Sequence, residues 1–150
     1  MDKRRYGYGF YFKCIQSAIE KSMNESLKDY DLTESQEKIM RFLRWTRLEK
    51  VSQKDIEEFY HISNPTVTGI LNRLEQKGYI RRIKGTSDKR VHYIEPTDKA
   101  LEVEQTIFQN VKAMEAKMVQ GLNAEEKELL FQLLEKVTKN VIEKEEEVNR

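Results

Sequence analysis

Asparagine, threonine and arginine side chains recur on one side of a helix predicted over residues 63–78. At about 100° per residue, one face of this helix holds Pro65, Gly69, Asn72 and Gln76, flanked by Thr68 and Arg73. Asn can hydrogen-bond adenine, Arg can bond guanine or phosphate, and Thr can bond a base or touch a thymine methyl. The face is small, polar and without acids, so it suits base recognition in a groove. It would equally suit the solvated side of an ordinary core helix.

A basic loop follows this helix. It runs from Gly85 to Arg90 and joins two segments rich in β-branched and aromatic residues, 79–84 and 91–95. Such segments predict a two-stranded hairpin, and Gly and Ser suit its turn. The cations Lys89 and Arg90 could serve solubility alone. Beside a polar helix face, they favour contact with a nucleic-acid backbone.

The sequence also predicts the helices and the turn that position these residues. Ser52 can cap a short helix that ends near residue 60, and residues 60–62 are short enough to be a turn. Ser63 or Asn64 can then cap the second helix, where Pro65 is tolerated near the start. Its inward face is apolar, and Gly78 is suited to end it. The inward residues are Val67, Ile70, Leu71 and Leu74. Helix, turn, helix and basic hairpin predict a winged helix-turn-helix, which reads the major groove of DNA.

With these features, the chain resembles the MarR family of bacterial transcription factors. The resemblance rests on segments 32–36, 65–68, 73–82, 88–90 and 94–97 together with Leu71, and the order and length of the helices extend it over nearly the whole chain. It implies a homodimeric, sequence-specific regulator of transcription that is not an enzyme and needs no cofactor. It further implies a repressor that binds an inverted repeat of double-stranded DNA and is released by a small phenolic or aromatic effector.

The candidate DNA-binding residues fall on the second helix and the hairpin. On the helix they are Asn64, Pro65, Thr66, Thr68, Gly69, Asn72 and Arg73, and on the hairpin Arg81, Arg82, Lys84, Lys89 and Arg90. We assign Thr68, Asn72 and Arg73 to bases. The phosphates are assigned to Arg81, Arg82, Lys84 and Lys89. By the resemblance, Arg90 would enter the minor groove and Asp88 would hold the wing arginines in place.

Charge is distributed unevenly along the 150 residues, although the net charge is only +1. Residues 50–95 hold 9 Lys and Arg against 6 Asp and Glu, whereas residues 96–150 hold 8 against 12. A positive centre and a negative tail fit a DNA-facing module carried by another that avoids DNA. The chain has neither a membrane-length apolar run nor a secretion signal, so a cytoplasmic location is expected.

The flanking segments predict amphipathic helices over residues 6–30 and 97–120, and a leucine-rich one after Asn123. Their apolar stripes exceed what a small winged helix can cover, so they predict a two-fold interface with a second chain. A helical bundle within one chain is the alternative. The fold is therefore expected to be mainly α (α+β). Its three parts would be an N-terminal dimerisation helix (1–31), the winged helix-turn-helix (32–96) and C-terminal dimerisation helices (97–150).

Cys14 is the only cysteine, so the chain can form no internal disulfide. We favour a small buried apolar role for it. The alternative is a redox-sensing regulator, since one branch of the family senses hydroperoxides through a cysteine near this place. His61 and His92 have no partners at metal-ligand spacing, so no metal site is predicted. A winged helix that binds protein rather than DNA also remains open.

Overall fold

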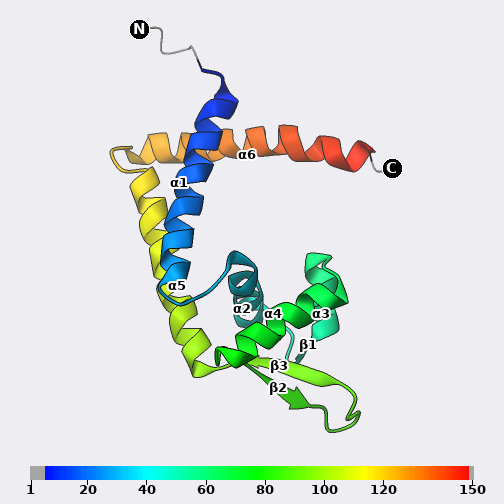
Figure 1. Ribbon diagram of the computed structural model, residues 1–150. Helices are drawn as coiled ribbons and strands as arrows, with labels where there is room; N and C mark the ends of the chain where they lie inside the picture. The colour runs from blue at the N-terminus through cyan, green and yellow to red at the C-terminus, as the bar shows by residue number, and fades with distance from the viewer. Residues whose placement is uncertain (1–5, 149–150) are drawn as a thin grey trace. The chain divides into compact units, whose positions relative to one another are not determined.

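The computed structural model describes residues 6–148, and the side chains of residues 6–142 (Figure 1). The elements, in chain order, are α1 (Tyr8–Lys28), α2 (Glu34–Trp45), β1 (Val51–Ser52), α3 (Gln53–Tyr60), α4 (Asn64–Gln76), β2 (Ile80–Lys84), β3 (His92–Pro96), α5 (Asp98–Met118) and α6 (Ala124–Val148). The chain divides into two compact units, Met1–Lys112 and Ala113–Arg150. The predicted boundaries after residues 31 and 96 stay predictions. Within the described residues, no helix is long and apolar enough to cross a membrane.

Short-range capping signals set the starts of the helices. The Thr33 hydroxyl accepts from the backbone N–H of Gln36, and the Gln36 side chain returns the bond, so α2 begins with a capping box. Ser52 forms the same box with Asp55 and starts α3, as predicted. Ser63 occupies the cap position of α4, but its hydroxyl lies 2.9 Å from the Thr66 hydroxyl and caps no backbone amide.

Two left-handed residues shape the helix-turn-helix. His61 closes α3 with φ 52°, a conformation that sequence reasoning did not anticipate for this turn. Gly78 follows α4 with φ 77°, so the predicted glycine end of that helix is confirmed. The chain then passes through Tyr79 directly into β2.

The sheet has three strands in the order β1-β3-β2, and both pairings are antiparallel. The predicted hairpin is present as β2 and β3, but the prediction of two strands was incomplete. Val51 pairs with Ile94, and Ser52 pairs with Tyr93, which adds β1 at the far edge of β3. A two-residue strand shows no alternation of apolar and polar residues, so no periodic pattern could reveal it.

The core lies beneath α4. Val67, Leu71 and Leu74 are fully buried and Ile70 is partly buried, so the predicted inward face is confirmed. They belong to one cluster that draws on every element from α1 to α5. Its other members include Leu27, Ile39, Met40, Val51, Ile56, Tyr79, Ile80, Ile94, Ala100 and Ile107. Helix α4 is thereby fixed to the sheet and to α2 from behind, and its outer face is left to solvent.

Polar side chains are also buried on α2 and α5. Glu37 on α2 is buried and forms an ion pair with Arg41, Oε1 to Nη1 3.3 Å. Glu104 on α5 is only 4% exposed, and its Oε1 has no hydrogen-bond partner. Burial and the charge of Glu37 raise the pKa of Glu104 to about 7, against the lowering effect of Arg41 and Arg44. Burial likewise raises the pKa of Glu37.

The last helix differs from the core in exposure. Asn123 and Glu126 form a capping box at its start, with both hydrogen bonds 2.9 Å long. Between residues 124 and 142, no side chain is classed as buried. The exposed large apolar residues there are Leu129, Phe131, Leu133, Leu134, Val137, Val141 and Ile142. This helix therefore has an apolar surface that is exposed in the single chain.

Candidate nucleic-acid interface

The outer face of α4 carries the candidate reading residues. Asn64, Pro65, Thr66, Gly69, Asn72 and Arg73 are exposed, and Thr68 is half-buried. Since the opposite face is packed against the core, the helix cannot rotate without unburying Val67 and Leu71. The structure therefore brings the helical candidates together on one fixed, solvent-exposed face.

Asn72 is tied to the hairpin by Arg82. The Arg82 Nη2 group donates to Asn72 Oδ1 at 2.8 Å, and its Nη1 group pairs with Glu75 Oε2. The side chain of Arg82 is 23% exposed. Arg82 was predicted to contact phosphate, but in this structure its guanidinium joins β2 to α4. Sequence reasoning missed the link because it requires residues of β2 and α4 to meet, which spacing along the chain does not show.

A second network ties α3 to the start of α4. The Gln53 Nε2 group donates to Thr68 Oγ1 at 2.8 Å and to Glu57 Oε1 at 2.9 Å. The Asn64 Nδ2 group donates to the same Glu57 oxygen at 2.7 Å. Gln53 and Glu57 were not predicted as site residues. The four-residue spacing that places them on one face of α3 was the only available signal.

The wing tip is held by its own backbone. Asp88 Oδ1 accepts from the Arg90 backbone N–H at 2.9 Å, and the Val91 N–H donates to the Asp88 carbonyl at 3.2 Å. A Cβ added at Gly85 would lie 2.6 Å from that carbonyl oxygen, so the turn requires glycine. Asp88 thus supports the backbone at Arg90. Figure 1 shows the β2–β3 loop extending beyond α3 and α4.

The remaining hairpin cations differ in their surroundings. Lys84, Lys89 and Arg90 are exposed. Arg81 is exposed as well and lies 4.0 Å from Glu95 on the neighbouring strand. Because side chains alternate along a strand, Arg81 and Arg82 point to opposite faces of the sheet. Only Arg82 can therefore reach α4.

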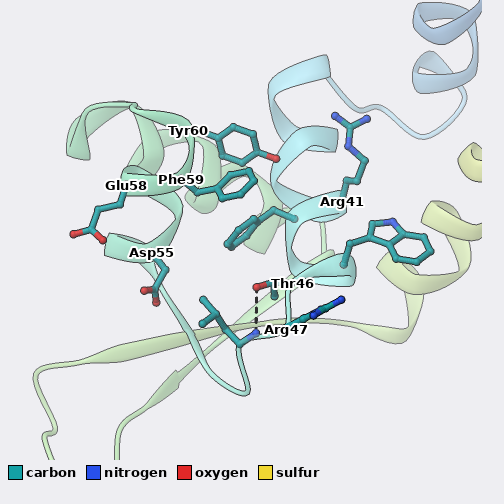
Figure 2. A pocket seen from close by; sticks show the side chains of 10 residues that line it. Arg41, Thr46, Arg47, Asp55, Glu58, Phe59 and Tyr60 are labelled. Carbon is teal, nitrogen blue, oxygen red and sulfur yellow. Dashed lines mark hydrogen bonds between the residues drawn. The ribbon is translucent and has the colours of Figure 1, made fainter. Parts of the chain in front are cut away.

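An aromatic groove lies between α2 and α3, on the same unit. We define this groove by Phe42, Trp45, Leu48, Phe59 and Tyr60, and its volume is about 910 Å³. Figure 2 shows Phe59 and Tyr60 extending from α3 toward α2. Arg41 and Arg47 also line it, as do Asp55 and Glu58. Exposed aromatic rings beside cations are suited to a flat organic anion.

Cys14 and the two histidines are exposed. Cys14 is exposed on α1, so the expectation of a buried cysteine is wrong for the single chain. Exposure is one of the conditions for thiol reactivity. His61 and His92 are exposed in the turn and on β3. Within residues 6–148, no group of three or more His, Cys, Asp or Glu residues could hold a metal ion.

Sequence comparison decides the family. The profile of the MarR family matches residues 32–92, from α2 to the start of β3. Two uncharacterized HTH-type transcriptional regulators of Bacillus subtilis (strain 168) are similar over most of their lengths. YwoH is 30% identical over 115 residues, which cover 77% of this chain and 82% of the relative. The chain belongs to the MarR family. YybA is 25% identical over 127 residues, which cover 85% of this chain and 83% of the relative.

Solved structures of the family share the fold. The MepR–DNA complex of Staphylococcus aureus matches with a TM-score of 0.79 and 25% identity, over 89% of this chain and 99% of that one. The mainly helical architecture with a small antiparallel sheet, expected from the sequence, is thus confirmed as the winged helix of MarR-type regulators. The family consists of transcriptional regulators rather than enzymes.

Proposed function

We propose that this MarR-family regulator is a homodimeric repressor without enzymatic activity that binds an inverted repeat of double-stranded DNA. The exposed outer face of α4 carries the proposal, because it places Thr68, Asn72 and Arg73 where a groove could receive them, and the acid beside it, Glu75, is paired with Arg82. Lys84, Lys89 and Arg90 extend the cationic surface along the wing. That MepR, a relative in fold, has been solved in complex with DNA supports the same use of this surface.

Dimerisation is part of the proposal. The apolar side chains of α6 are exposed in the single chain, and they form the kind of surface that a second copy would bury. Two copies related by a two-fold axis would present two α4 helices about one DNA turn apart. Such a pair reads an inverted repeat and covers a promoter, and a repressor acts in this way.

The aromatic groove is our candidate effector site. A phenolic or aromatic acid could stack on Phe59 and Trp45, with its carboxylate near Arg41 or Arg47. Occupation would favour one spacing of α2 and α3, and α3 is hydrogen-bonded to α4 through Gln53. Trp45 is the only tryptophan, so quenching of its fluorescence by benzoate or phenol measures binding directly. No quenching at millimolar probe would remove this role.

The central test is selection from a pool of random duplex DNA across a salt series. An enriched inverted repeat, with affinity that falls steeply with salt, is the expected result. Absence of enrichment and of binding at low salt would instead favour a protein-binding winged helix. Fusion of the selected repeat to a reporter promoter then checks repression.

Arg90→Ala sharpens this test at the wing. We expect about 10- to 100-fold weaker operator binding, because a narrow minor groove attracts an inserted arginine through its negative potential. Lys89→Ala is the matched control, since it removes one cation from the same loop and should weaken binding to all sequences evenly. Both variants should melt like the parent. Parent-like operator binding by Arg90→Ala would show that the wing assignment is wrong.

A further inference from the structure

Asn72 has a fixed orientation in this structure, and the chemistry of its partner dictates it. An arginine guanidinium carries only donors, so the amide atom facing Arg82 must be the carbonyl oxygen Oδ1. The Nδ2 group therefore points away from Arg82. Among the described residues, it makes no hydrogen bond, and Asn72 itself is exposed. Asn72 thus presents two N–H donors at the outer face of α4.

Glu75 keeps Arg82 in this position. The guanidinium spans the carboxylate of Glu75 and the amide of Asn72, which lie one turn of α4 apart. Its planar fork of donors suits two acceptors at once, whereas a lysine ammonium is a single compact charge. The side chain is largely buried, so its ordered position costs little further conformational entropy. Arg82 is consequently engaged inside the reading unit.

The Thr68 oxygen likewise accepts a hydrogen bond from within the protein. Gln53 Nε2 must be the amide nitrogen, because it also contacts the Glu57 carboxylate, which accepts only. Its bond to Thr68 therefore occupies the Thr68 oxygen as an acceptor and leaves the O–H proton available outward. Two independent networks thus each occupy one acceptor position on the oxygen of a candidate reading residue, Thr68 or Asn72, and turn that oxygen toward the protein. The outer face is biased toward donation.

We propose that Arg82 is a positioning residue that directs the Nδ2 group of Asn72 at an acceptor on a DNA base, and that it is not a phosphate contact. The inference rests on the proposed DNA-binding function. In the major groove, guanine offers two neighbouring acceptors and thymine offers one, whereas cytosine offers only a donor. Adenine is best bonded by an Asn that uses both Oδ1 and Nδ2, and Arg82 holds Oδ1. The base facing Asn72 is therefore guanine, with thymine next.

The test compares base preferences of purified full-length variants on the selected DNA site and on every single-base change of it. Asn72→Ala first identifies the position that Asn72 reads. Arg82→Lys keeps the positive charge but cannot bond Asn72 and Glu75 as a fork. We expect it to reduce discrimination at that position by about tenfold and to shift the preference toward adenine, because Oδ1 is released. Arg81→Lys, the same change at the neighbouring residue, should leave the preference unaltered.

A phosphate role would give a different pattern. Arg82→Ala would then weaken binding evenly at all sequences and lower the salt slope, with base preference unchanged, and that result would overturn the inference. A double-mutant cycle gives a second measure, since Arg82→Lys should change no preference in an Asn72→Ala background. If the Arg82 variants unfold at a lower temperature than the parent, Glu75→Ala is the alternative variant. Glu75 is exposed, and its replacement frees the Arg82 guanidinium and should reduce discrimination at the same base pair. A parent that binds no DNA would instead refute the proposed function itself.

Discussion

The helix-turn-helix and the last helix treat their apolar side chains in opposite ways. Around α4, Val67, Leu71 and Leu74 are fully buried within the chain. Along α6, Leu134, Val137 and other large apolar residues are exposed. The apolar side chains of α4 are covered by a core to which every element from α1 to α5 contributes, whereas those of α6 form a surface that is exposed to water. An apolar patch of this kind marks an interaction site, which supports the proposal that α6 contributes to dimerisation and that the outer face of α4 binds DNA.

The largest effect is expected from placing negative charges on the exposed apolar surface of α6. We expect Leu134→Glu with Val137→Glu to convert the dimer to a monomer, because two carboxylates would have to be buried at the interface. Operator affinity should then fall by roughly 100-fold or more, since the second half-site is no longer linked to the first. Sedimentation gives the oligomeric state, and fluorescence anisotropy gives the affinity.

Lys136→Glu is the matched control for that pair. It changes the charge of α6 by the same amount, but at about 100° per residue it lies away from the stripe of residues 134, 137 and 141. It should remain dimeric. Equal dissociation by both changes would mean that charge repulsion, and not loss of an apolar contact, separates the chains, and the assembly role of this face would be lost.

The burial of the inner face of α4 is tested by a substitution in the core. Leu71→Ala should lower the free energy of unfolding by about 3 kcal/mol, because it removes a fully buried side chain and leaves a cavity. Urea unfolding measures the loss. The control is Leu101→Ala, at a position 40% exposed on α5, where a smaller cost is expected. Similar costs at both positions would contradict the burial of the inner face of α4.

Local signals explain what the sequence could predict. The cap at Ser52 depends on a residue three positions away, and it was predicted from the sequence. The inner face of α4 and the glycine at its end were equally local. Each of these features is decided within one turn or one helix, where spacing along the chain is spacing in space.

The features that were missed need partners far apart in the chain. β1 exists only because Val51 meets Ile94, and neither residue alone predicts a strand of two residues. Arg82 could be recognised as a cation but not as the link between β2 and Asn72. Cys14 was assigned to a core by its residue type, although type does not say which side of a helix finds a neighbour. Long-range pairing therefore limited the prediction of the site more than that of the fold.

The smallest effect is expected at Glu104, a carboxyl group that is buried on α5. Its pKa is raised from 4.5 to about 7 by burial and by Glu37, so folding favours its protonated form. Its contribution is fully present below about pH 4.5 and is lost as pH rises through about 7. Glu104→Gln should therefore be more stable than the parent at pH 8, by about 1–2 kcal/mol, and nearly equal at pH 4.5.

Urea unfolding of the parent and of Glu104→Gln across this pH range measures the difference between their free energies of unfolding. The titration of the other groups contributes equally to both proteins and cancels in this difference. Glu102→Gln, on an exposed face of the same helix, should show no such pH-dependent gain. An equal gain in both variants would trace the effect to the overall charge of α5. A gain confined to Glu104→Gln would show that Glu104 is a buried carboxyl group that is costly to ionise, because burial disfavours its charge and its Oε1 has no hydrogen-bond donor.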